Sequence, residues 1–185
     1  RIAADCGVEM VAIHGRTRTQ QYTGLADWDY LEGLNATSPL PLVGNGDLVD
    51  GAAVRKRLSE TRCPALMVGR GALRNPFIFL EALDEKNEFE FSAEDHWAVI
   101  RCLSELIRQH SEDLGLPPVV KTERLRKFIL WMAVGLPRVV QFRTLLLGIM
   151  NWEDLLKHTE DYFMSVGNST KTIDYSQKFM AGGHG

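Results

Sequence analysis

The sequence predicts an α/β protein in which parallel β-strands alternate with helices and an all-helical segment follows. Three apolar runs, rich in valine and isoleucine, are too short for helices and are typical of buried strands. These runs are residues 8–14, 40–45 and 65–70. Helical stretches over residues 26–36 and 50–61 separate them at the spacing of a βαβ unit. The strands are therefore predicted to be parallel, with polar groups gathered at their carboxyl ends.

The alternation ends after Pro76, where a short apolar helix leads into the acidic connector DEKNEFEF. Ser92 is predicted to cap a long helix, with Asp95 at its third position. Three further helices are predicted to begin at Pro117, Pro137 and Asn151. We therefore expect a first domain over residues 1–83, a helical domain over residues 84–164 and a disordered tail over residues 165–185.

The net charge of −3 over 185 residues conceals a segregation of charge. Residues 84–113 contain nine acidic and three basic side chains, whereas residues 121–143 contain six basic side chains and one acidic. A basic segment in an acidic protein predicts a local contact with a polyanion. The three cysteines are widely spaced and lack a nearby histidine cluster, which indicates neither a disulfide framework nor a metal site and favours a cytoplasmic location.

The chain opens with Arg1 inside what resembles the end of a helix, so we expect further sequence to precede it in the parent protein. No apolar run approaches the roughly 18 residues that a membrane span needs. No charged and then apolar leader opens the chain either. A soluble protein without membrane association is therefore expected.

Polar, glycine-containing loops follow the second and third predicted strands. Asn45, Gly46 and Asp47 follow the second, and Gly69 and Arg70 follow the third. Glycine lets backbone amides approach a phosphate closely, and arginine can bind two of its oxygens. The two loops predict a phosphate site, completed by a short helix from the NPFIF segment. The alternative is that these glycines only form tight turns.

His14 ends the first predicted strand, and Arg16 and Arg18 follow it. We predict that His14 points into the active face and that both arginines lie on its rim, which suggests an anionic cofactor or substrate. Two plainer interpretations stay open. One is a histidine with a structural hydrogen bond, and the other is a solvated turn.

Lys121, Arg124 and Lys127 recur at three-residue spacing along a predicted helix, with Arg126 one step off. They cover a broad face on which the phosphates of a nucleic acid could be neutralised. The alternative is an ordinary solvated helix face. The neighbouring apolar and aromatic residues are predicted to be core rather than base-stacking groups: Phe128, Ile129 and Trp131.

Four motifs together resemble the tRNA-dihydrouridine synthase family. They are, in order, VAIHGRTRTQQYTGLADW, PLVGNGD, MVGRGALRNPFIF and KTERLRKFILWMAVGLP. The first three are similar to the second half of that family's barrel, and the fourth resembles the basic helix of its C-terminal domain. The likeness covers about residues 5–160. It implies the C-terminal part of a TIM (β/α)8 barrel followed by an all-α helix-bundle domain.

The resemblance also implies an enzyme that reduces uridine in tRNA to 5,6-dihydrouridine, with FMN as cofactor and NADPH or NADH as reductant. By this resemblance, His14 approaches the flavin and Arg16 lies where flavin and RNA meet. The residues implied to hold the FMN phosphate are Asn45, Gly46, Asp47, Gly69 and Arg70. The expected RNA-binding residues are Arg16, Arg18, Lys121, Arg124 and Lys127.

The chain departs from this family because it lacks the catalytic cysteine of the NxGCP motif. Its own cysteines stand elsewhere: Cys6 in ADCGV, Cys63 in TRCPA and Cys102 inside a predicted helix. Cys63 is predicted to be a buried, structural thiol. The first barrel strands are absent as well. We therefore expect the isolated chain to be inactive and prone to self-association through its open sheet edge, and the parent to be a monomer.

Two other functions stay open. One is another FMN-dependent TIM-barrel oxidoreductase that acts on a small molecule, although the basic helical domain speaks against it. The other is a non-catalytic RNA-binding fragment in which the barrel remnant is only a platform. Restoring the N-terminal half would separate an enzyme from such a fragment.

Overall fold

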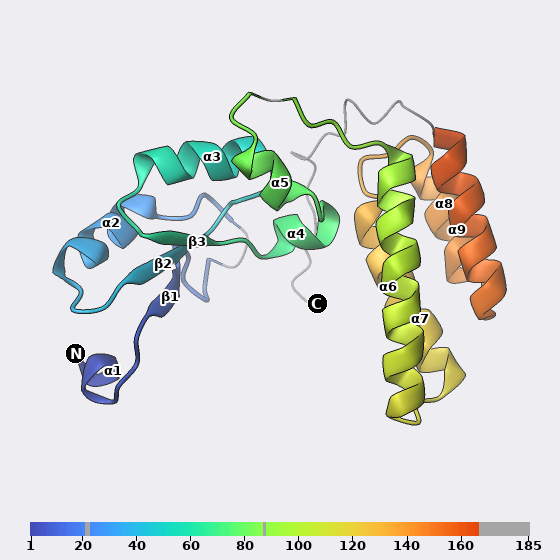
Figure 1. Cartoon of the computed structure of the whole chain (residues 1–185), viewed down its shortest axis with the longest axis horizontal. Helices are drawn as coiled ribbons and strands as arrows, with labels where there is room; N and C mark the ends of the chain where they lie inside the picture. Colours follow the sequence, from blue (N-terminus) through green and yellow to red (C-terminus); the bar gives the residue numbers. More distant parts are fainter. Residues whose placement is uncertain (21–22, 87, 167–185) are drawn as a thin grey trace. The chain divides into compact units, whose positions relative to one another are not determined.

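A computed structural model describes residues 1–20, 23–86 and 88–166 of the chain. They form two compact units (Figure 1), which we call the sheet unit and the helical unit. The sheet unit contains residues 1–72 and 77–86, and the helical unit contains residues 73–76 and 88–166. None of the helices in these ranges is long and apolar enough to cross a membrane.

The sheet unit is built on three parallel strands in the order β1-β2-β3. Their bounds are β1 Val11–His14, β2 Leu42–Asn45 and β3 Ala65–Met67. All three predicted strands are present, but each is shorter than its apolar run. The third ends at Met67 because the chain turns into a helix at Arg70. The register aligns His14 with Asn45, and Asn45 with Met67.

Five helices accompany this sheet: α1 Ile2–Asp5, α2 Trp28–Thr37, α3 Gly51–Glu60, α4 Arg70–Arg74 and α5 Ile78–Leu83. The two longer ones begin at aspartates, because the Asp27 and Asp50 side chains accept hydrogen bonds from amides of the first turn. The short apolar helix predicted after Pro76 is present as α5, which begins within the NPFIF segment at Ile78. A separate short helix, α4, precedes that segment.

The two faces of the sheet differ in cover. On one face, Ile13 and Leu66 pack with Trp28, Leu31 and Val54 of α2 and α3. We call the other the open face. It carries His14, Asn45 and Met67, of which Met67 is 50% exposed. Since side chains alternate along a strand, the residues before the carboxyl-end loops project towards space that the described residues leave open.

Four helices make the helical unit: α6 Ala93–Asp113, α7 Pro118–Met132, α8 Val139–Leu147 and α9 Trp152–Val166. The predicted capping box is present, since Ser92 and Asp95 exchange side-chain and backbone hydrogen bonds. Asn151 caps α9 as predicted, its side chain accepting from the Asp154 amide over 3.0 Å. A shared apolar core holds the helices together, with Ile129 fully buried in it.

Two predicted boundaries in this unit are wrong. The third helix begins at Val139 rather than Pro137, because Arg138 adopts a left-handed backbone with φ of 59° just before it. The last helix continues to Val166, because Tyr162, Phe163 and Val166 still pack into the core. It therefore extends two residues into the predicted tail, and residues 167–185 lie outside the described residues.

Replacing Gly44 with alanine is expected to destabilise the sheet unit by about 1–3 kcal/mol. The reason is that the new Cβ would lie 2.6 Å from Trp28 Cζ3. Gly33, exposed inside α2, is the matched control, because a Cβ built there meets no described atom within 4 Å. Gly33→Ala is expected to stabilise by about 0.5–1 kcal/mol. Urea unfolding followed by circular dichroism measures both changes, and equal responses would contradict the packing of Trp28 on β2.

Candidate functional site

Polar loops follow the carboxyl ends of the three strands. We call this end of the sheet the carboxyl edge. Because the strands are parallel and in register, the loops that follow His14, Asn45 and Met67 begin at the same edge. The structure thereby gathers at strand ends and loops of one edge all the residues predicted to bind the cofactor: His14, Asn45, Gly46, Asp47, Gly69 and Arg70.

His14 is exposed at the end of β1 and makes a hydrogen bond within its own loop. Its Nδ1 accepts from the amide of Arg16 over 3.1 Å. An accepting Nδ1 keeps its lone pair, so the neutral ring carries its proton on Nε2. His14 thus combines the two sequence-based interpretations. One ring nitrogen makes a structural hydrogen bond, and the other is an N–H donor.

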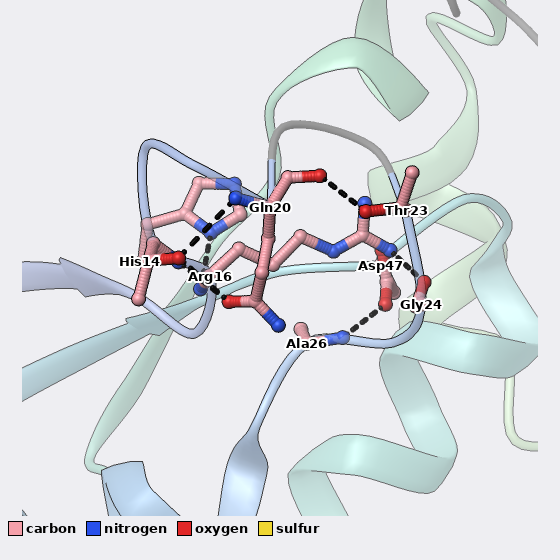
Figure 2. A network of polar contacts seen from close by, with 8 residues as sticks. His14, Arg16, Gln20, Thr23, Gly24, Ala26 and Asp47 are labelled. Carbon is pink, nitrogen blue, oxygen red and sulfur yellow. Dashed lines mark hydrogen bonds and ion pairs between the residues drawn. The ribbon is translucent and has the colours of Figure 1, made fainter.

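Arg16 points into the protein rather than onto a solvated rim, because Asp47 lies within its reach. Its guanidinium lies 2.7 Å from Asp47 Oδ1 and donates to the carbonyl of Gly24, also over 2.7 Å (Figure 2). Only 7% of the Arg16 side chain is exposed. Asp47 Oδ2 accepts from the Ala26 amide over 2.6 Å. Little of Arg16 is therefore left for a direct contact with RNA, and Arg16 instead joins the β1–α2 loop to the β2–α3 loop.

The turn after β2 has an unusual backbone at two successive residues. Gly46 and Asp47 have φ of 143° and 55°. A Cβ on Gly46 would also lie 2.5 Å from the Ala26 side chain, so glycine is required there by both backbone and packing. The Asp47 carboxylate is already occupied by Arg16 and Ala26. An anion at this turn would therefore meet backbone amides and not the carboxylate.

Gly69 differs from the other glycines of these loops. A Cβ built on Gly69 meets no described atom within 4 Å, whereas one on Gly71 would lie 2.4 Å from the Leu48 carbonyl oxygen. Packing thus explains why glycine is required at position 71. It does not explain glycine at position 69, where the backbone is not left-handed either. The backbone of Gly69 is accessible to a ligand. Arg70, half-buried, follows it at the start of α4.

The predicted RNA-binding residues of the helical unit lie on α7. Lys121 Nζ is 5.3 Å from the centroid of the Trp152 ring, and Lys127 Nζ is 5.0 Å from that of Trp131. Arg124 is exposed. Aromatic faces thus support two of the three cations while leaving their charges at the surface of this unit.

Arg126 belongs to the core and not to the charged face. Its side chain is buried, and its guanidinium donates to the carbonyl of Ile149. It shares the buried side of α7 with Thr122, Leu125 and Ile129. Trp131, predicted as core, is only half-buried and packs edge-on against Phe128.

Gly24 and Ala26, which bind Arg16 and Asp47, were not predicted from the sequence as members of the site. They contribute only backbone groups, which leave no side-chain signal. A signal did exist for the ion pair, since Arg16 and Asp47 carry opposite charges just after neighbouring strands. Arg18 is exposed, as expected of a rim residue.

Comparison with known proteins identifies the family. The family model described as "Dihydrouridine synthase (Dus)" matches residues 1–166. A probable tRNA-dihydrouridine synthase of Rickettsia typhi is 31% identical over 177 residues, which are 92% of this chain and 52% of the relative. The tRNA-dihydrouridine synthase B of Xanthomonas axonopodis pv. citri is 34% identical over 167 residues, 88% of this chain and 49% of the relative. This chain thus spans about half the length of these relatives, and it belongs to the dihydrouridine synthase (Dus) family.

Proposed function

We propose that this chain is the C-terminal part of an enzyme that reduces uridine in tRNA to 5,6-dihydrouridine, with FMN as cofactor and NADPH or NADH as reductant. The observation that carries the proposal is the carboxyl edge of the sheet unit, where an open glycine backbone at Gly69 shares an edge with the donor His14. The names of the bacterial relatives point to the same reaction. On this proposal, residues 1–83 are part of a TIM barrel and residues 84–164 bind tRNA.

The residues of this edge fit the phosphate end of FMN. A phosphate needs hydrogen-bond donors, positive charge and a close approach to the backbone. Gly69 leaves that space, Arg70 follows it, and the Asp47 charge is neutralised by Arg16. The residues that would hold the phosphate are Asn45, Gly46, Asp47, Gly69 and Arg70. When bound, the flavin supplies the hydride for the uracil double bond.

The chain's own residues would bind and orient the RNA around this edge. His14 would donate a hydrogen bond from Nε2 to the flavin or the base. Because a stacked base cannot reach such a site, the target uridine has to be turned out of its helix. Arg18 and the cations of α7, Lys121, Arg124 and Lys127, would neutralise tRNA phosphates and hold the turned-out strand.

On this proposal the proton donor for the uracil is the cysteine of the family's NxGCP motif, which this sequence does not contain. Cys63 is buried, as predicted. Cys6 follows α1, before β1, and therefore lies away from the carboxyl edge, while Cys102 belongs to α6 of the helical unit. We therefore infer that the chain alone binds tRNA without forming dihydrouridine, and that catalysis needs the N-terminal half of the enzyme.

The proposal is tested with this chain and with a chimera that places the N-terminal half of the Rickettsia typhi relative before it. Visible absorbance after gel filtration reports retained FMN, and mass spectrometry of digested tRNA reports dihydrouridine. We expect the chimera to retain FMN and to form dihydrouridine when a nicotinamide reductant is added. The chain alone is expected to bind tRNA without forming product.

The other outcomes identify the alternatives. A chimera that retains FMN but reduces only small molecules, with the intact relative active on tRNA, would indicate a small-molecule oxidoreductase. Binding of tRNA by a folded chimera that retains no FMN would indicate a non-catalytic RNA-binding protein. Either result would overturn the proposed reaction.

Arg70→Ala in the chimera is expected to weaken FMN binding by about 2–3 kcal/mol, because a charge-assisted contact to the phosphate is lost. Lys56→Ala is the control, since it removes an exposed charge of the same unit from α3. Quenching of flavin fluorescence measures both affinities. Undiminished FMN binding by Arg70→Ala would show that Arg70 does not contact the phosphate.

Replacing Lys121, Arg124 and Lys127 together with glutamine is expected to lower tRNA affinity and to reduce the slope of log Kd against log salt by about two to three. Glutamine retains part of the packing against Trp131 and Trp152 while removing the charge. The control replaces three exposed cations of α6 and α9: Arg101, Arg108 and Lys157. Equal slopes for the two triple variants would show that the three α7 residues form an ordinary solvated helix face and do not bind tRNA.

A further inference from the structure

The amide of Arg16 faces a ring nitrogen of His14, and this contact bears on the chemistry of the ring. The amide is a donor and lies 3.1 Å from Nδ1. With the proton on Nδ1, two donors would oppose each other, whereas the Nε2–H form accepts the hydrogen bond. One hydrogen bond of ordinary net strength favours the Nε2–H form about fivefold to tenfold. The backbone position of residue 16 therefore selects the tautomer of His14.

That backbone position is held by the side chain of the same residue. Arg16 reaches across to Asp47 on the next loop, over 2.7 Å, and to the carbonyl of Gly24 (Figure 2). Asp47 is itself fixed by the Ala26 amide, over 2.6 Å. Next to residue 16, the Gly15 amide donates to the Asn45 carbonyl over 2.8 Å. The two loops are thus joined at several points, which together restrain the backbone at residue 16.

We propose that Arg16 is a positioning residue for His14 and not a direct contact for RNA. The Arg16–Asp47 pair holds the residue 16 amide against His14 Nδ1, and the amide keeps His14 in the Nε2–H form. The exposed ring then offers a single N–H donor on the open face of the sheet. It fits a hydrogen-bond acceptor on a planar ring, such as a carbonyl oxygen or an unprotonated ring nitrogen.

This proposal rests on the proposed function only for the identity of that acceptor, which would belong to the flavin or the uracil. A histidine of the opposite tautomer would present a bare nitrogen there and would repel a carbonyl oxygen. The pairing also explains why an acid stands in a loop predicted to hold phosphate. Asp47 acts on Arg16, and its charge is neutralised in doing so.

The tautomer of His14 is measured on the full chain by long-range proton–nitrogen NMR with labelled histidine, at a pH where the ring is neutral. The signals of His14 are assigned among the five histidines by their loss in His14→Gln. We expect wild type to show Nε2–H, and Arg16→Ala and Asp47→Asn to show a mixture with Nδ1–H. The amide of residue 16 is expected to exchange about tenfold faster in Asp47→Asn than in wild type.

Two controls separate positioning from a general loss of structure. Arg18→Ala removes an exposed charge two residues along the same loop and is expected to leave the tautomer unchanged. Arg16→Lys retains a cation for Asp47 and is expected to restore the Nε2–H form. Indole signals of Trp28 report whether each variant is folded, and Asp47→Asn decides the result if Arg16→Ala is not.

Two results would overturn the positioning role. One is an Nδ1–H ring in wild type, and the other is a wild-type tautomer in folded Arg16→Ala or Asp47→Asn. The measurement needs neither flavin nor tRNA. A chimera without FMN but with the expected tautomers would therefore contradict the proposed function alone, and the reverse result would contradict only the positioning role.

Discussion

Parallel pairing of three short strands is the constraint on which this edge of the molecule depends. An antiparallel pairing would send alternate loops to opposite edges, whereas the observed register places the ends of β1, β2 and β3 side by side. Residues that lie about thirty positions apart in the chain are thereby brought to one edge. The packing of Trp28 against Gly44 keeps the helices on one face, so the polar ends of the strands stay accessible on the other.

Charge at this edge is arranged by pairing. Arg16, Arg18 and Asp47 lie in the loops after β1 and β2, and their charges would form a surface of mixed sign if all three were exposed. Arg16 is buried against Asp47, so one charge of each sign is removed from the surface. The short ion pair and the further hydrogen bond from Ala26 offset the cost of taking these charges out of water. Arg18 stays exposed in the loop after β1, and the half-buried Arg70 follows Gly69 at the start of α4.

The helical unit shows how one basic run is divided between core and surface. A helix has 3.6 residues per turn, so Thr122, Leu125, Arg126 and Ile129 share one side of α7 and are buried together. Arg126 becomes a core residue that donates to the Ile149 carbonyl. Lys121 and Lys127 fall outside that side and lie against aromatic rings instead. The position in the helical period, and not the type of charge, decides which cations stay available.

The sequence by itself determined the order of the elements, the caps at Ser92 and Asn151, and the loops that carry the predicted site residues. These features depend on local patterns: apolar periodicity, capping residues and glycine-containing turns. Only the tertiary structure decided the ends of β3 and α9, the burial of Arg126, and the direction in which Arg16 points. Each of these depends on which groups from distant parts of the chain come within contact distance, and a carboxylate 31 positions away is invisible to a local pattern. For the same reason the sequence marked His14 as a site residue, but the fold selected the nitrogen that carries its proton.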